Sequence, residues 1–177
     1  KVSLQENLNM IRESVGYLKA HKMKVFYDAE HFFDGYKSNK EYALETLRSA
    51  IKGGCDAVYL CDTNGGMVTY ELGVITRSIC NEFDLPIGIH THNDSGMAVA
   101  NSIAAVENGV SVVQGTINGY GERCGNGDLC VIIPNLQLKL GYKCLPNSKI
   151  KELTEVSRYI SEISNMKQQD NQPYVGR

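Results

Sequence analysis

The sequence has little of several features that mark specialised classes of protein. It contains no Trp, only 4 Pro, and no C-x-x-C pair among its 6 Cys. We therefore predict buried, reduced thiols instead of a disulfide framework or a zinc ribbon. Neither sign of charge is in large excess, because the sequence has 18 basic and 20 acidic residues. Without a basic patch, we predict no nucleic-acid partner.

Long apolar runs are also missing from the 177 residues. No stretch approaches the roughly 20 apolar residues of a membrane helix, and no signal segment opens the chain. We therefore predict a cytoplasmic protein with no membrane partner. The sequence starts at Lys1 without Met and ends on Arg177 without a helix stop, so we expect a piece of a longer polypeptide.

What the sequence does contain is a regular alternation of strand-like and helix-like segments. Short apolar runs that predict strands recur every roughly 24 to 32 residues, the period of a βα unit. These runs cover residues 25–27, 57–61, 87–92 and 110–115. Capping boxes at Ser3–Glu6 and Ser38–Glu41 and apolar residues at helical spacing predict helices between and after the strands. The first predicted helix has about five turns and follows Ser3, and the others cover residues 39–53, 69–83, 96–108, 128–140 and 147–163.

Apolar strands that alternate with amphipathic helices predict an α/β fold with a parallel sheet. A complete (β/α)8 barrel needs eight strands and about 250 residues, whereas four strands are predicted here. Half a barrel and an open sheet both fit this count. The polar tail from Asn165 is interpreted as a linker.

Polar side chains follow each of the four predicted strands. The clusters are Asp28–His31, Asp62–Asn64, His90–Asp94 and Gln114–Thr116. Because the carboxyl ends of parallel strands share one edge, where α/β proteins bind ligands, we expect the clusters to converge there. The alternative for the aspartates is that they cap the helices that follow.

His90 and His92 are the most informative pair in these clusters. Side chains two apart on a strand share a face with Cβ atoms about 7 Å apart, so two imidazoles could hold one cation. The pair therefore predicts a metal site at a strand end. The alternative is two ordinary polar residues where a strand meets a loop.

A glycine-rich loop covers residues 118–127. It does not match the dinucleotide motif G-x-G-x-x-G, because Cys124 replaces the last glycine and the loop follows the last strand instead of the first. We expect its glycines to allow a sharp bend that turns Glu122, Arg123 and Asn126 toward the histidine edge. The alternative is a charged pair that only fastens a flexible loop.

Four ordered motifs together resemble the citramalate, 2-isopropylmalate and homocitrate synthase family. They are Phe26–Gly35, Asp62–Gly66, His90–Asp94 and Gly119–Asn126. The first motif is most similar to the citramalate synthase branch. The resemblance implies a (β/α)8 barrel in which residues 1–142 supply strands five to eight, followed by a helical linker or subdomain start at 143–177.

The resemblance also implies an activity. Members are acyltransferases that condense acetyl-CoA with a 2-oxo acid, here pyruvate giving (R)-citramalate for branched-chain amino-acid (isoleucine and leucine) biosynthesis. It implies a divalent metal ion, Mn²⁺, Zn²⁺, Co²⁺ or Mg²⁺. Because a half-barrel would expose two sheet edges and an apolar face, we expect them to be covered by the rest of the parent protein or by another copy, and we predict a homodimer for the full-length parent. His90, His92 and Asn126 would bind the metal, Thr63 and His90 would contact the 2-oxo acid, and Glu30 would be the catalytic acid/base.

Two parts of the family pattern are missing from this sequence. No D-R-D-G segment supplies a third, carboxylate metal ligand, and the catalytic histidine beyond the barrel is absent. We therefore expect these 177 residues alone to bind metal weakly and to show no turnover. The alternatives are a 2-isopropylmalate or homocitrate synthase, a metal-dependent carbon–carbon lyase or decarboxylase, and a non-catalytic half-barrel.

Overall fold

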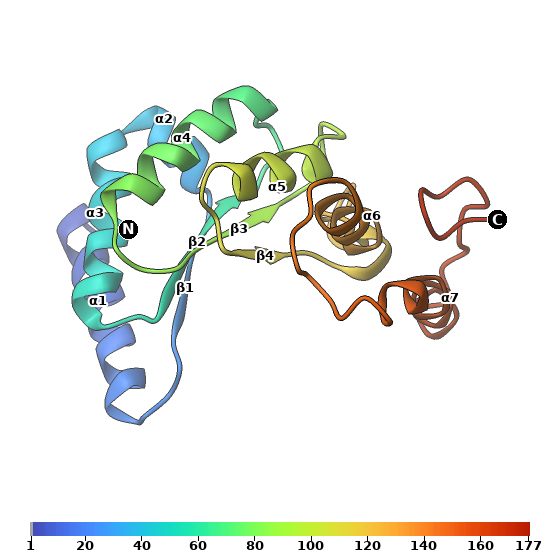
Figure 1. The fold of residues 1–177 in the computed structure, drawn as a ribbon. Coiled ribbons are helices and arrows are strands. Elements are labelled where there is room, and N and C mark those ends of the chain that lie inside the picture. Colours follow the sequence, from blue (N-terminus) through green and yellow to red (C-terminus); the bar gives the residue numbers. More distant parts are fainter. Residues whose placement is uncertain (1) are drawn as a thin grey trace.

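The computed structural model describes residues 2–177 and contains a single four-stranded parallel β-sheet (Figure 1). The strands lie in chain order: β1 (Phe26–Ala29), β2 (Ala57–Asp62), β3 (Ile87–Thr91) and β4 (Val112–Gln114). The α-helices are α1 (Leu4–Ala20), α2 (Phe32–Ser38), α3 (Lys40–Gly53), α4 (Thr69–Glu82), α5 (Ala98–Glu107), α6 (Leu129–Pro134) and α7 (Leu153–Ile163). Shorter helical turns are η1 (Ile117–Gly119), η2 (Asn135–Lys139) and η3 (Ile150–Glu152). The predicted α/β class is confirmed.

All neighbouring strands pair in parallel, for example with Val58 opposite Ile87 and Gly88 opposite Val112. Each connection between them contains a helix, as a parallel crossover requires. The observed strand boundaries lie within two residues of those predicted from the apolar runs.

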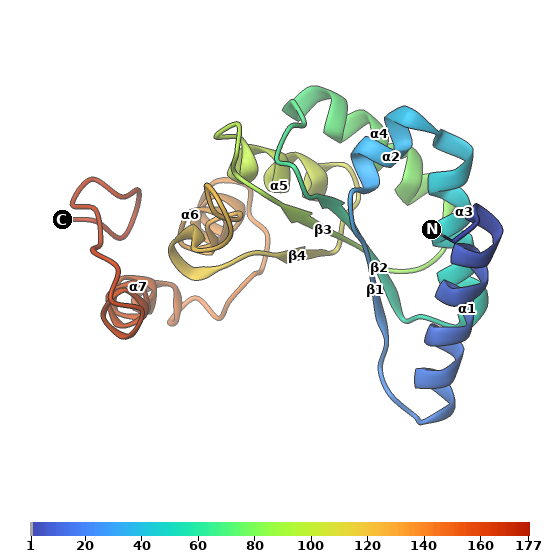
Figure 2. The ribbon, with the colours of Figure 1, turned by 180° about the vertical axis from the view of Figure 1, so that it is seen from behind.

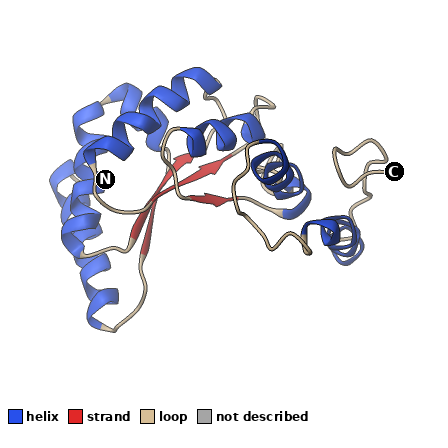
Figure 3. Cartoon of the chain, in the orientation of Figure 1, coloured by secondary structure: helices blue, strands red, loops and turns tan. Residues whose placement is uncertain are grey.

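Helices α2 to α5 cover one face of the sheet (Figure 3). Alternate side chains of β2 and β3 point into this layer, where Val58, Leu60 and Ile89 are fully buried. Burial of one such side chain contributes about 1.5–3 kcal/mol. The helices contribute fully buried residues of their own, among them Phe33, Leu47, Leu72 and Ile79.

The opposite face of the sheet has no helix packed on it within residues 2–177, and Figure 2 shows the strands from behind. Phe26 and Val112 are 48% and 38% exposed. Tyr59 is buried nevertheless, because its ring lies across Gly88 and next to Phe26, with ring centroids 5.7 Å apart.

The sheet curves strongly toward this uncovered face. Gln114 on β4 and Asp28 on β1, the two outer strands, approach to 3.3 Å between Nε2 and Oδ1. Three strand spacings of about 4.8 Å would separate the outer strands of a flat sheet by about 14 Å. Curvature therefore draws the side chains at the carboxyl ends of the strands together.

One helix of the structure is missing from the sequence prediction. Helix α2 follows His31, whose backbone is left-handed with φ 56°. Because Ser38 closes α2, the predicted capping box at Ser38–Glu41 is wrong, and Asn39 caps α3 instead by accepting from the Tyr42 N–H. The first capping box is confirmed, since the Ser3 hydroxyl accepts from the Glu6 N–H at 3.1 Å.

The C-terminal helices are more broken than predicted. The helix expected over 128–140 divides into α6 and the π-helical turn η2 at Pro134, which has no N–H to donate. The helix expected over 147–163 begins only at Ile150, as the 3₁₀ turn η3, and continues as α7.

The residues after α7 fold back onto the protein. Val175 is 1% exposed and packs with Cys130 and Leu153. The Gln172 amide donates to Asn118 Oδ1 at 3.2 Å. The tail that was interpreted as a linker thus makes tertiary contacts.

All six cysteines are free, as predicted. Cys61 and Cys130 are buried, but Cys124 and Cys144 are exposed, so the prediction of burial is wrong for these two. Both lie in irregular segments at the surface, outside the apolar runs of the helices and strands. Within residues 2–177, no helix is long and apolar enough to cross a membrane.

Candidate active site

The carboxyl edge of the sheet brings the predicted polar clusters together. His90 and His92, on and just after β3, present their rings on the same side with centroids 5.0 Å apart and planes inclined by 35°. His92 is 8% exposed, and its Nδ1 has no hydrogen-bond partner. Burial lowers the pKa of His92, and the neighbouring His90 and Arg123 lower it further. The lowered pKa favours the neutral ring, in which one nitrogen carries a lone pair for a ligand.

Asn126 meets the histidines from the glycine-rich loop. Its backbone forms an isolated bridge with His92, and its amide Nδ2 donates to the Tyr120 carbonyl at 3.3 Å. This bond leaves Oδ1 buried without a partner. Gly121 makes the approach possible, because a Cβ there would lie 2.3 Å from Asn126 Nδ2.

These donors fit the divalent metal that the resemblance implies. Within residues 2–177, three buried side-chain polar atoms lack a hydrogen-bond partner, and two of them belong to His92 and Asn126. Imidazole nitrogen and amide oxygen are suitable ligands for divalent first-row metals. The described residues hold no metal-binding group of three or more His, Cys, Asp or Glu, so two imidazoles and an amide are the donors present.

Glu30 lies just beyond β1 and is held by Thr63. The Thr63 hydroxyl donates to Glu30 Oε2 at 2.7 Å and accepts from the His31 N–H at 2.8 Å. The single hydroxyl proton of Thr63 is thus directed to Glu30. The structure therefore brings the predicted acid/base and the predicted substrate contact together as one hydrogen-bonded pair.

Arg123 fastens the glycine-rich loop to the same edge. Its guanidinium binds both carboxylate oxygens of Asp94, at 2.8 and 2.9 Å, and donates to the Thr63 carbonyl at 2.6 Å. This pairing lowers the pKa of Asp94 and raises that of Arg123. Arg123 therefore turns toward the histidine edge as predicted. Its pair with Asp94 also fastens the loop, as the alternative interpretation expects of a charged pair. Glu122 points to solvent, with its side chain 83% exposed, and the prediction is wrong for this residue.

The aspartates of the strand ends have different roles. Asp62 is 2% exposed and accepts from the N–H groups of Gly66 and Met67, so it stabilises the turn before α4. Burial raises its pKa. Asp94 does not cap α5; the side chain of Asn93 accepts from the Ala98 N–H instead.

Sequence reasoning missed the role of Gln114. Gln114 Oε1 lies 2.8 Å from His90 Nδ1, and its Nε2 lies 3.3 Å from Asp28 Oδ1. The signal was present in the alternation of side chains, since His90 pairs with Gln114 in the sheet register. The sequence predicts a polar cluster after the fourth strand but does not predict that Gln114 contacts His90.

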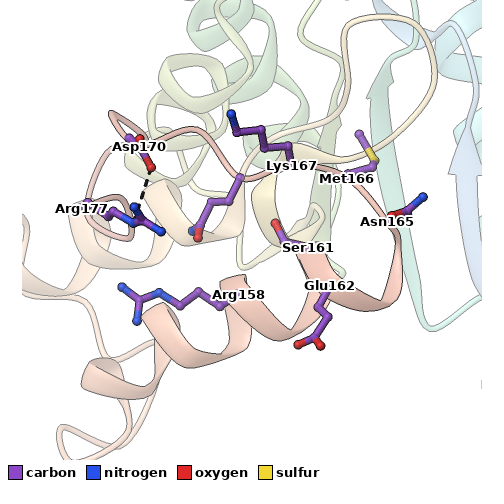
Figure 4. Close-up of a pocket in the computed structure, with 9 residues that line it drawn as sticks. Arg158, Ser161, Glu162, Asn165, Met166, Lys167, Asp170 and Arg177 are labelled. Atoms are coloured by element: carbon purple, nitrogen blue, oxygen red, sulfur yellow. Dashed lines mark ion pairs between the residues drawn. The ribbon is translucent and has the colours of Figure 1, made fainter.

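One hollow lies away from these residues, between α7 and the C-terminal tail (Figure 4). It has a volume of about 800 Å³ and exposed walls of mixed charge, with Arg177 and Asp170 paired at 3.6 Å. It contains none of the predicted site residues. We place the candidate active site at the carboxyl edge of the sheet, because the unpartnered buried donors are there.

Comparison with known proteins gives consistent results. The HMGL-like family profile matches residues 1–160. The chain is 57% identical over 177 residues to the (R)-citramalate synthase of Aquifex aeolicus, covering 99% of this chain and 34% of that protein. It is 51% identical over 176 residues to the (R)-citramalate synthase of Geobacter sulfurreducens, covering 99% and 33%. The predicted resemblance is confirmed.

More distant similarity extends to a probable 2-isopropylmalate synthase of Methanosarcina mazei, at 37% identity over 177 residues, covering 100% of this chain and 33% of that protein. Among solved structures, an HMG-CoA lyase of Bacillus subtilis has a similar fold, with a TM-score of 0.76 at 17% identity over 95% of this chain and 58% of that one. The chain spans about a third of the length of the curated relatives it matches.

Proposed function

Because the chain belongs to the HMGL-like family, we propose that it is part of an acyltransferase that condenses acetyl-CoA with a 2-oxo acid. The proposed acceptor is pyruvate and the product (R)-citramalate, a precursor in branched-chain amino-acid biosynthesis. The observation that carries this proposal is the 57% identity to a named (R)-citramalate synthase over 99% of this chain.

The proposed architecture is half of a (β/α)8 barrel. Residues 1–142 would supply strands five to eight, and residues 143–177 would begin a linking region. Three observations support this: the strands lie in chain order, the outer strands approach through Gln114 and Asp28, and one face of the sheet has no helix within residues 2–177. The carboxyl edge would then be the active-site face of the barrel.

His90, His92 and Asn126 would hold the divalent metal. Three observations support this: the two rings lie 5.0 Å apart, the Asn126 backbone bridges to His92, and His92 Nδ1 and Asn126 Oδ1 are buried without a hydrogen-bond partner. When bound, the metal would polarise the keto oxygen of the 2-oxo acid. Burial lowers the pKa of His92 and so favours the neutral ring, the form that can act as a ligand. Arg123 would hold the loop that carries Asn126 close to the histidines.

Glu30 would move the proton of the acetyl methyl group. The carboxylate is aimed by the Thr63 hydroxyl, which leaves Oε1 free to accept. A positioned carboxylate of this kind contributes typically about 10²–10⁴ in rate. Thr63 would therefore orient Glu30. To contact the 2-oxo acid, the Thr63 hydroxyl would have to give up its hydrogen bond to Glu30.

The experiment uses the complete polypeptide that carries these residues, purified with Mn²⁺. Free CoA and the condensed product are measured with acetyl-CoA and each of pyruvate, 2-oxoisovalerate and 2-oxoglutarate. Pyruvate should give the highest kcat/KM, with discrimination of about 10–200-fold per methylene. Preference for 2-oxoisovalerate would favour a 2-isopropylmalate synthase, and carbon–carbon cleavage without condensation would favour a lyase.

Glu30→Gln tests the proposed proton transfer. We expect kcat to fall about 10²–10⁴-fold, while Mn²⁺ affinity stays within a few-fold. Glu13→Gln, an exposed change on α1, is the matched control and should keep full activity. Equal activity of Glu30→Gln and the control would remove Glu30 from the mechanism. Residues 1–177 alone should show no CoA release.

A further inference from the structure

A chain of three side chains crosses the uncovered face of the sheet. Asp28 on β1, Gln114 on β4 and His90 on β3 are joined by two hydrogen bonds, of 3.3 and 2.8 Å. The first bond connects residues 86 positions apart. His90 and Gln114 lie opposite each other on neighbouring strands, whereas the contact between Gln114 and Asp28 requires the curvature of the sheet.

The polarity of this chain follows from its ends. A carboxylate only accepts hydrogen bonds, so Gln114 must direct its NH₂ group to Asp28. Its carbonyl Oε1 then faces His90, and a carbonyl oxygen also only accepts. His90 Nδ1 must therefore carry the proton, which leaves the lone pair on Nε2.

We propose that Gln114 is a positioning residue for His90, and that Asp28 sets the orientation of Gln114. Together they hold His90 in the tautomer protonated at Nδ1, with Nε2 available as the metal donor. This inference rests on the proposed function in one respect, the assignment of His90 as a ligand. Partners of ligating histidines at this distance typically change metal affinity about 10–100-fold when they are removed.

Isosteric variants distinguish this role from a purely structural one. In Asp28→Asn, the new side chain can donate as well as accept, so Gln114 can rotate and offer its NH₂ group to His90. Gln114→Met removes both hydrogen bonds at similar volume. Gln114→Glu keeps an acceptor beside Nδ1. Val112→Ala, two residues earlier on the same face of β4, is the matched control.

The experiment records ¹⁵N signals of histidine rings in the complete, metal-free polypeptide at pH 8, with His90 assigned by its loss in His90→Ala. In the unmodified protein, Gln114→Glu and Val112→Ala, we expect protonated Nδ1 and bare Nε2. In Asp28→Asn and Gln114→Met, the signal should shift toward the other tautomer. Titration with Mn²⁺ alone should give about 10–100-fold weaker binding in these two variants only.

Two results would overturn the inference. One is a proton on Nε2 in the unmodified protein, or an unchanged tautomer in Asp28→Asn and Gln114→Met. The other is a shifted tautomer with unchanged Mn²⁺ affinity. Because the tautomer is measured without metal or substrate, the outcome is separate from the synthase assay, and failure of that assay alone would count against the proposed function.

Discussion

The contact between Gly88 and Tyr59 provides a quantitative test of the structure. Tyr59 on β2 lies opposite Gly88 on β3, and its ring occupies the space where a side chain would stand. In Gly88→Ala, the new Cβ would lie 2.2 Å from Tyr59 Cδ1, 2.4 Å from Cε1 and 2.8 Å from Cγ. Ordinary carbon contacts are about 3.5–4.0 Å, so the ring would have to move by about 1 Å or more.

The ring has little room for this movement. Tyr59 is 3% exposed, and its centroid lies 5.7 Å from that of Phe26. Overpacking of a filled site typically costs about 1–3 kcal/mol. For a protein of this size, 1 kcal/mol corresponds to a change in Tm of about 2–4 °C. We therefore expect Gly88→Ala to lower Tm by about 2–12 °C.

The same substitution, glycine to alanine, should stabilise the protein at Gly35. Gly35 lies within α2, and a Cβ there would have nothing within 4 Å. Gly35→Ala should stabilise the protein by about 0.5–1 kcal/mol, because alanine loses less entropy in a helix than glycine. Thermal unfolding followed by circular dichroism measures the Tm of both variants, and urea unfolding measures their free energies of unfolding.

The refuting result is a Gly88→Ala protein as stable as the unmodified one or as Gly35→Ala. A double variant separates packing from other causes. In the background of Tyr59→Leu, where the ring is gone, the cost of Gly88→Ala should nearly disappear. A cost that persists in this background would mean that the ring is not the obstacle.

Two further predictions concern the thiols and the loop. At pH 8, iodoacetamide should modify the exposed Cys124 and Cys144 quickly, but the buried Cys61 and Cys130 only in urea. Burial raises the pKa of Cys130 to about 11 and raises that of Cys61 further. Rapid labelling of Cys61 or Cys130 in the folded protein would contradict their burial. Because the folded pKa of Asp94 lies below its ordinary value of 3.8, its contribution to stability is present above that pH and lost as pH falls through the folded pKa. Arg123→Gln should flatten the acid-unfolding profile below about pH 4, and an unchanged profile would exclude the pair as its source.

The sequence was sufficient to predict the strands, most of the helices and the sheet edge at which the polar residues gather. Apolar runs at regular spacing predicted four strands near their observed positions. The polar residues after them indicated the edge where the His90 and His92 rings lie side by side and where Glu30 pairs with Thr63. These signals are local, because they depend on side-chain periodicity and capping within a few residues. These local signals did not predict helix α2, because it is only 7 residues long and depends on the burial of Phe33 against the sheet.

Only the tertiary structure decided which side chains bond to each other. No local pattern connects Asp94 with Arg123, 29 positions away, or Asp28 with Gln114, 86 positions away. Both contacts arise because a curved parallel sheet gathers its carboxyl ends within side-chain reach. Periodicity along a chain therefore determined what is present at this edge, while strand curvature and loop packing determined how those groups hold one another.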